Sequence, residues 1–217
     1  MQNYSLMIQS FSAIMKSSPL LSKCCMMILM GIVLIKSVSG QSSYFQQDVN
    51  YLINVSLNDE KHELTGNISI DYKNNSGDTL REIKMHLWPN AYKDRNTALA
   101  RQLTENGRTG LYFSEAKNRG YIDSTDFKIN GQKVNVAFHP EYVDIISLKL
   151  KEPLLPGASI TISSPFRVKI PSGRFSRLGH IGESYQIVQW YPKPAVYDKN
   201  GWNEMPYLDQ GEFYSEY

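Results

Sequence analysis

The stretch Tyr185–Asp198 reads Tyr-Gln-Ile-Val-Gln-Trp-Tyr-Pro-Lys-Pro-Ala-Val-Tyr-Asp, and it joins strand-forming residues to polar groups that have no plain structural use. Its first six residues alternate with the period of a strand whose two faces are both occupied. Pro192 and Pro194 remove backbone donors and fix an extended chain, so we expect the strand to stop at Pro192. Trp190 and Tyr191 would then lie at a rigid exit from a sheet.

Gln186 and Gln189 are the candidate binding residues of this stretch, because their side chains lie near the expected end of the strand. An amide in that position can hydrogen-bond a ligand. The alternative is that each glutamine pairs with a neighbouring strand inside the sheet, and this alternative is the stronger one for Gln189.

The aromatic content indicates an all-β protein. The 217 residues include 14 Tyr, 8 Phe and 3 Trp, which are residue types that favour strands, and stretches with helical periodicity are scarce. The length suits one large β-domain or two small ones. We therefore predict an all-β fold with a large, antiparallel, twisted sheet or a sandwich.

Alternating apolar and polar residues predict where the strands lie. The expected strands are Val49–Leu57, His62–Lys73, Leu80–Trp88, Val143–Leu150 and Ser159–Ile170. The turn residues between the first two predict a hairpin. In the third, we expect Ile83, Met85 and Leu87 to point inward, and Lys84, His86 and Trp88 to point outward.

Two local signals punctuate this pattern. Asn130-Gly131 predicts a type I′ turn between Phe127–Ile129 and Val134–Phe138, because both turn residues tolerate positive φ. A short helix is expected from about Ala98, with Asn96 or Thr97 as its cap and Asn106-Gly107 as its end. The remainder of 90–124 is a long loop that is either functional or a plain insertion.

The first 40 residues are expected to form a signal peptide. They contain three lysines and no acidic residue, and the run Cys24–Ile35 is apolar but short for a membrane span. Small residues at Val38-Ser39-Gly40 precede a cleavage site ahead of Gln41, and residues 41–47 are polar enough for a linker. The alternative is an uncleaved single-pass anchor, which would be the chain's only membrane contact.

The basic excess belongs to this leader. Without residues 1–40 the chain has 20 basic and 21 acidic residues, so nothing favours a nucleic-acid partner. Both cysteines leave with the leader, which excludes a disulfide from the mature domain. Four basic residues lie close together at Arg167, Lys169, Arg174 and Arg177; this run either meets acidic groups elsewhere or is an ordinary solvated surface.

No motif for catalysis or metal binding is present in the sequence. His62-Glu63 begins like the zinc motif His-Glu-x-x-His, but Gly66 stands where the second histidine is needed. His86, His139 and His180 are scattered, and Gly179 and Gly182 predict a loop around His180. No Gly-x-Ser-x-Gly elbow or glycine-rich phosphate loop occurs. We therefore predict no catalytic residue and no metal site in this chain.

The stretch Tyr185–Asp198 nevertheless resembles a known family. A glutamine followed by Gln189-Trp190-Tyr191-Pro192-Lys193-Pro194, then Tyr197-Asp198 and Asn200-Gly201-Trp202, is similar to the end of the N-terminal β-domain of family M1 zinc aminopeptidases, in their bacterial secreted branch. The turn Leu154-Leu155-Pro156-Gly157 resembles the same domain. The resemblance covers about residues 45–217 and implies a saddle-like β-domain at 48–217.

The resemblance implies a role for this chain within a larger protein. In the family a glutamine or glutamate on this strand helps to hold the free α-amino group of the peptide, and Gln186 matches that position. Zinc would belong to the complete parent enzyme, and the peptide substrate would be shared with a catalytic domain that this sequence lacks. Gly211–Tyr217 is expected to begin a further strand, so we expect a C-terminally truncated fragment of a secreted or periplasmic hydrolase.

A protein of another class is the alternative to the peptidase domain. The chain would then be a free-standing, exported β-sandwich that binds a glycan or a protein through an aromatic platform. Its platform would consist of Trp88, Trp190, Tyr191 and Trp202.

Overall fold

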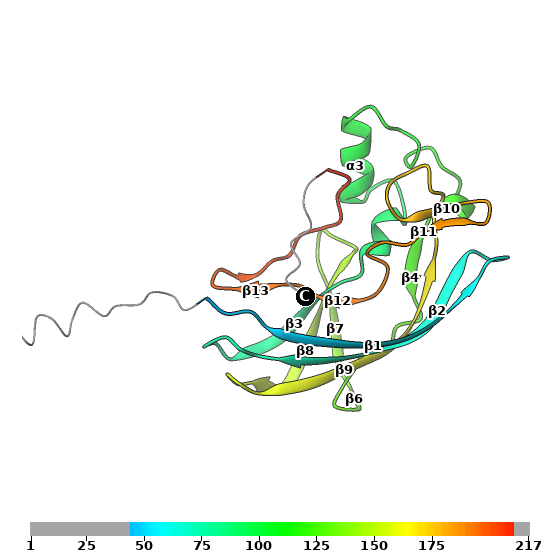
Figure 1. The fold of residues 1–217 in the computed structure, drawn as a ribbon. Coiled ribbons are helices and arrows are strands. Elements are labelled where there is room, and N and C mark those ends of the chain that lie inside the picture. The colour runs from blue at the N-terminus through cyan, green and yellow to red at the C-terminus, as the bar shows by residue number, and fades with distance from the viewer. Residues whose placement is uncertain (1–43, 211–217) are drawn as a thin grey trace, which may run out of the picture. The chain divides into compact units, whose positions relative to one another are not determined.

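The computed structural model describes residues 44–210, and residues 45–210 belong to one compact unit whose strands pair in antiparallel sheets (Figure 1). This confirms the predicted all-β fold. The predicted strand at 211–217 and the leader at 1–40 lie outside the described residues. No helix among residues 44–210 is long and apolar enough to cross a membrane.

The larger sheet is built on three long strands, with the order β1-β2-β9-β5-β6 and β4 also paired to β9. The long strands are β1 (Asp48–Asn58), β2 (Glu63–Lys73) and β9 (Ser159–Lys169); the short ones are β4 (Tyr121–Asp123), β5 (Lys128–Ile129) and β6 (Gln132–Lys133). All eleven residues of β1 pair in register with β2, which confirms the predicted hairpin.

The second sheet has the order β12-β3-β8-β7. Its strands are β3 (Leu80–His86), β7 (Asn135–Phe138), β8 (Ile145–Leu154) and β12 (Lys193–Pro194). β8 continues beyond the expected end at Leu150, through Pro153 to Leu154, and the chain turns after Leu155. A proline is tolerated within a short edge strand such as β12 because the missing N–H is not needed by a second neighbour.

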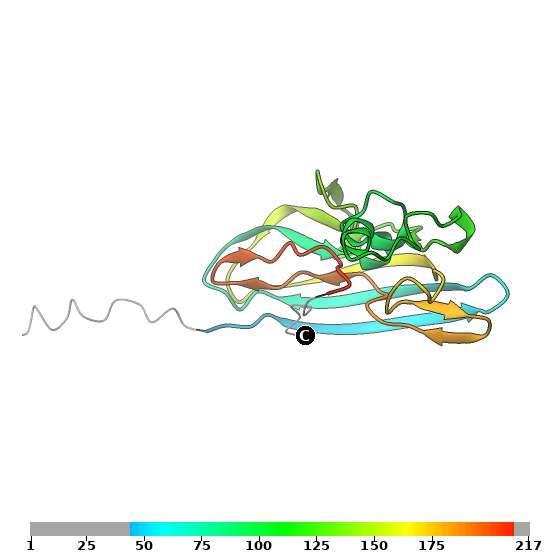
Figure 2. The ribbon, with the colours of Figure 1, turned by 90° about the horizontal axis from the view of Figure 1, so that it is seen from above.

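Smaller elements lie on one side of the long strands (Figure 1). They are the hairpin of β10 (Gly179–Ile181) and β11 (Ser184–Gln186), the hairpin of β13 (Tyr197–Asp198) and β14 (Gly201–Trp202), the helix α3 (Ala98–Glu105), and the 3-10 turns η1 (Trp88–Tyr92) and η2 (Ala116–Asn118). Figure 2 shows the two hairpins over opposite ends of β1 and β2.

The helix and the tight turn follow their sequence signals. Thr97 is the N-cap of α3 and accepts a hydrogen bond from the Ala100 N–H, whereas Asn106 ends the helix. Asn130 and Gly131 have φ of 50° and 78°, as a type I′ turn requires. The residues before the expected strand Val134–Phe138 form β6 and pair with β5 in the first sheet, whereas β7 lies within the expected strand and pairs with β8 in the second sheet.

One prediction about β3 is wrong. Ile83, Met85 and Leu87 point into the core as expected, but His86 and Trp88 are also buried, with only 2% of each residue exposed. Their face of the second sheet is covered by the chain that follows β14, where the Met205 carbonyl accepts a hydrogen bond from Trp88 Nε1 at 3.3 Å. Periodicity within one strand carries no information about a distant segment that covers its outer face.

Candidate functional site

The alternation predicted one strand from Tyr185 to Pro192, and this prediction is wrong. β11 ends at Gln186, and Gln189 adopts a φ of 53°, which no extended strand contains. The chain then becomes extended again after Pro192 and adds β12 to the edge of β3, with Lys193 opposite His86. The prolines therefore begin a new edge strand instead of ending an old one.

The structure places the two candidate glutamines in different surroundings. Gln186 is exposed at the end of the β10–β11 hairpin, opposite Gly179. Gln189 is half-buried at the turn after β11. No residue within 44–210 hydrogen-bonds either side-chain amide, so Gln186 presents both its carbonyl and its NH₂ group to solvent. Whether a substrate amine uses either residue stays a prediction.

Aromatic packing holds the chain after Gln186 against the first sheet. Trp190 lies against Phe166 of β9 with ring centroids 5.9 Å apart, and Tyr191 meets Tyr51 of β1 edge-on at 5.4 Å. Such pairs contribute about 0.5–1.5 kcal/mol each beyond the area they bury. The segment between β11 and β12 is thus a fixed wall.

A buried cluster of Lys193, Trp88 and His86 lies directly after this segment. Lys193 is 5% exposed, and its ammonium lies 4.3 Å from the centroid of the Trp88 ring, while His86 stacks on the same indole at 4.5 Å. Burial lowers the pKa of Lys193 to about 8, and burial together with the Lys193 charge lowers the pKa of His86 to about 3. His86 is therefore neutral at physiological pH, and the cluster is closed to a large ligand.

The aromatic platform of the alternative interpretation is not assembled. Trp88 lies under the Met205 segment, and Trp202 packs edge-on against Tyr197 in the β13–β14 hairpin. Trp190 and Tyr191 are half-buried against the first sheet. A glycan-binding surface needs exposed ring faces, so this geometry does not favour the alternative.

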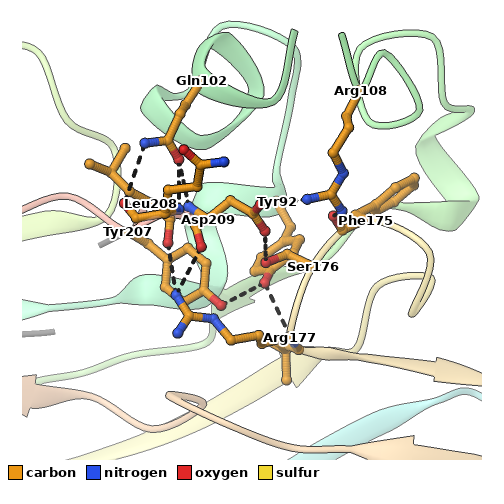
Figure 3. A network of polar contacts seen from close by, with 11 residues as sticks. Tyr92, Gln102, Arg108, Phe175, Ser176, Arg177, Tyr207, Leu208 and Asp209 are labelled. Carbon is orange, nitrogen blue, oxygen red and sulfur yellow. Dashed lines mark hydrogen bonds and ion pairs between the residues drawn. The ribbon is translucent and has the colours of Figure 1, made fainter. Parts of the chain in front are cut away.

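A polar network fixes the last described residues on α3 (Figure 3). Asp209 pairs with Arg108 and accepts a hydrogen bond from Ser176 Oγ at 2.7 Å, while Gln102 Oε1 accepts from the Asp209 N–H at 2.7 Å. Arg177 donates to the carbonyl oxygen of Leu208 at 3.1 Å. The network joins three segments that are far apart in the sequence, which no local motif signals.

The basic run is largely used inside the fold. Arg167 forms a bidentate pair with Asp123 at 2.9 and 2.6 Å, Lys169 donates to the Lys61 carbonyl, and Arg177 belongs to the polar network. Arg174 is the exposed member. The run is therefore not a continuous basic surface.

Two histidines that are far apart in the sequence lie in contact. The rings of His62 and His180 stack with centroids 3.5 Å apart and planes 19° apart, and His62 Nδ1 lies 2.7 Å from the Tyr185 hydroxyl. His180 belongs to strand β10 and not to a loop, which corrects the sequence prediction. Its separation from His62 by more than a hundred residues leaves no pattern that sequence reasoning can detect.

The described residues do not provide a zinc site. Within 44–210, no three His, Cys, Asp or Glu side chains lie close enough together to hold a metal ion. The stacked pair supplies two imidazoles, and a structural zinc site needs four ligands.

Comparison with known proteins gives matches at the level of structure alone. No protein-family model matches the chain, and no curated protein sequence matches it. An M1 zinc metallopeptidase mutant from Deinococcus radiodurans is similar with a TM-score of 0.39 and 15% identity, over 63% of this chain and 25% of the peptidase. A two-domain M1 zinc metallopeptidase mutant bound to L-arginine gives a TM-score of 0.38 and 16% identity over the same shares.

This chain therefore spans a quarter of the length of the peptidases it matches. A third similar structure, again from Deinococcus radiodurans, holds a Tyr-Ser-Ala substrate, with a TM-score of 0.38 and 13% identity. These are structures of the family that the Gln189–Pro194 motif resembles. At such TM-scores and identities, the similarity carries no argument about what this chain binds.

Proposed function

We propose that residues 45–210 belong to the N-terminal β-domain of an exported M1-type zinc aminopeptidase, and that this domain anchors the peptide substrate without performing the chemistry. The motif around Trp190 and Pro192 motivates the family, and the all-β architecture agrees with it. The observation that carries the proposal is the position of Gln186, whose exposed amide bonds no residue within 44–210.

The chemistry suits the amino terminus of a peptide. The side-chain oxygen of Gln186 can accept a hydrogen bond from an ammonium, and such a charge-assisted bond is about twice as strong as one between neutral groups. A hairpin that is docked on the domain can hold that oxygen in place. The aromatic wall after Gln186 fixes the following chain, and the preceding hairpin contacts the β1–β2 turn through His62, so the glutamine lies between two segments that contact the domain.

Zinc enters this proposal only through the parent protein. Because no three His, Cys, Asp or Glu side chains within 44–210 lie close enough to hold a metal ion, the proposal assigns the zinc ligands and the reaction to residues outside 44–210. The role proposed for this chain is limited to binding and orienting the substrate.

The test is the Gln186→Ala substitution in the full-length parent. Loss of a charge-assisted hydrogen bond costs about 1.5–3 kcal/mol, so kcat/KM for peptides with a free amino terminus should fall roughly ten- to hundredfold. An N-acetylated peptide offers no ammonium and should lose far less. Steady-state kinetics with the paired substrates measure the difference.

Two further variants complete this test. Gln186→Glu should retain amine binding, since a carboxylate also accepts from an ammonium. Gln189→Ala should change stability more than kinetics, if its side chain serves the fold. Equal losses for free and acetylated peptides in Gln186→Ala would show that the residue does not bind the amine.

A further inference from the structure

The contact between His62 and His180 joins the β1–β2 turn to strand β10, which belongs to a separate two-stranded sheet. His62 closes the turn between β1 and β2 with a φ of 53°, a left-handed conformation that is uncommon for a residue other than glycine. Its carbonyl oxygen accepts a hydrogen bond from the Ile170 N–H at 2.9 Å, which ties the turn to the end of β9. The imidazole is therefore carried by a fixed piece of backbone.

The β10–β11 hairpin brings the other half of the contact. His180 stacks face to face on His62 at 3.5 Å. From β11, the Tyr185 hydroxyl lies 2.7 Å from His62 Nδ1 and 3.2 Å from the Asp59 carbonyl oxygen, to which it can donate a hydrogen bond. The ring pair and the hydroxyl together bridge the hairpin to the β1–β2 turn.

Little else holds the tip of this hairpin. Ile181 at the tip is 63% exposed, and Glu183, Ser184 and Gln186 are exposed as well. The base is attached through hydrogen bonds of His180 N–H to the Pro171 carbonyl at 3.0 Å and of Gly173 N–H to the His180 carbonyl at 2.9 Å. An element with few buried apolar contacts opens at a lower free energy than the sheets beneath it.

The charges around the stack disfavour a second proton. Burial is the main cause that lowers the pKa of His62, and the charges of His180 on β10 and Lys169 on β9 lower it further. Asp59 in the turn partly offsets this by raising the pKa. Lys61 lies next to His62 in the same turn, and Glu183 lies in the turn of the hairpin. Two imidazolium rings stacked at 3.5 Å would repel each other, whereas neutral rings attract.

We propose that His62, His180 and the Tyr185 hydroxyl form an acid-sensitive latch, which holds the β10–β11 hairpin on the β1–β2 turn while the imidazoles are neutral and releases it when both are protonated. The direction follows from linkage: a histidine whose pKa is lowered by folding contributes stability above its unfolded pKa, and that contribution is lost as the pH falls. The latch needs no ligand and does not depend on the proposed function, although the released hairpin carries Gln186.

Amide hydrogen exchange of the full 217-residue chain at pH 7.5 and pH 5 tests the latch. After correction for intrinsic exchange, protection of the hairpin amides at 179–186 should fall by roughly a factor of ten at pH 5, because the repulsion between two like charges in contact is of that order. Amides of β2 and β9 should keep their protection. Equal loss in hairpin and sheets, or no loss in the hairpin, would overturn the latch.

Three variants identify the groups. His180→Phe keeps a stacking ring that takes no proton, so hairpin protection should become independent of pH. Tyr185→Phe removes the hydroxyl and should lower protection already at pH 7.5. His139→Phe is the matched control, because His139 stacks on Tyr142 away from the hairpin, and it should respond to pH as the unaltered chain does. A pH response that persists in folded His180→Phe would contradict the proposal. If that variant does not fold, the comparison of the unaltered chain at pH 7.5 and pH 5 is the test.

Discussion

Single buried residues decide how the chain after β14 is held. Asp144 is 3% exposed, and its Oδ2 accepts a hydrogen bond from the Tyr207 N–H at 2.7 Å, which fixes the segment that covers Trp88. Burial raises the pKa of Asp144 to about 6, since hydrogen bonds from the backbone of Tyr207 and of Asp144 itself do not replace the water that a carboxylate loses. A charged carboxylate at this position is therefore a cost to stability at neutral pH.

Asp144→Asn should raise the free energy of unfolding at pH 7.5 by about 1–3 kcal/mol. The asparagine oxygen can still accept from the Tyr207 N–H, and no charge is buried. The native state binds the Asp144 proton more tightly than the unfolded chain, so the original residue contributes stability at low pH that is lost as the pH rises through about 6. Urea unfolding should therefore show a smaller gain for the variant at pH 5.

Asp48→Asn is the matched control for this experiment, because Asp48 is exposed and its ion pair within residues 44–210 is with the exposed Lys73 at 3.6 Å. Its substitution should change stability by less than about 0.5 kcal/mol at either pH. An equal gain for Asp144→Asn at both values of pH would show that its carboxyl does not titrate between them.

At the scale of the elements, the close approach of three long strands depends on one glycine. Gly66 lies in the first half of β2, between Val55 of β1 and Phe166 of β9. A Cβ atom there would lie 2.3 Å from the Asn54 carbonyl oxygen and 2.9 Å from Cζ of the Phe166 ring. The ring fills the space above the glycine and in turn supports Trp190, so the wall after β11 begins at this position.

Gly66→Ala should destabilise the domain by about 1–3 kcal/mol, since backbone and ring must both move. Gly77→Ala is a suitable control, because a Cβ atom at that turn meets nothing within 4 Å. Chemical denaturation of both variants measures the difference. If the two variants are equally stable, the strands are able to separate at Gly66 without cost.

At the scale of the whole molecule, two hydrophobic clusters meet at the stretch between β11 and β12. The first lies between the two sheets, and the second gathers around Trp88, Tyr92 and Leu103 of η1 and α3. Ile187 and Trp190 pack against both clusters. The stretch that directly follows Gln186 thus packs against both the sheets and the helical part.

We also propose that the whole chain is exported and that its leader is removed. The apolar run Cys24–Ile35, followed by Val38-Ser39-Gly40, should direct cleavage near Gln41. Intact-mass measurement of the exported protein should give a chain that begins close to Gln41. Exported protein that still carries residues before Met26 would indicate an uncleaved anchor.

The sequence by itself determined the all-β class, the β1–β2 hairpin, the cap of α3 at Thr97 and the Asn130-Gly131 turn. Each depends on neighbours in the chain, whose periodicity and φ preferences are local properties. Only the tertiary structure decided that His86 and Trp88 are buried, that β11 ends at Gln186, and that His62 meets His180. These features arise from contacts between segments that are distant in the sequence. The residue pattern of one segment does not indicate which distant segment will pack against it.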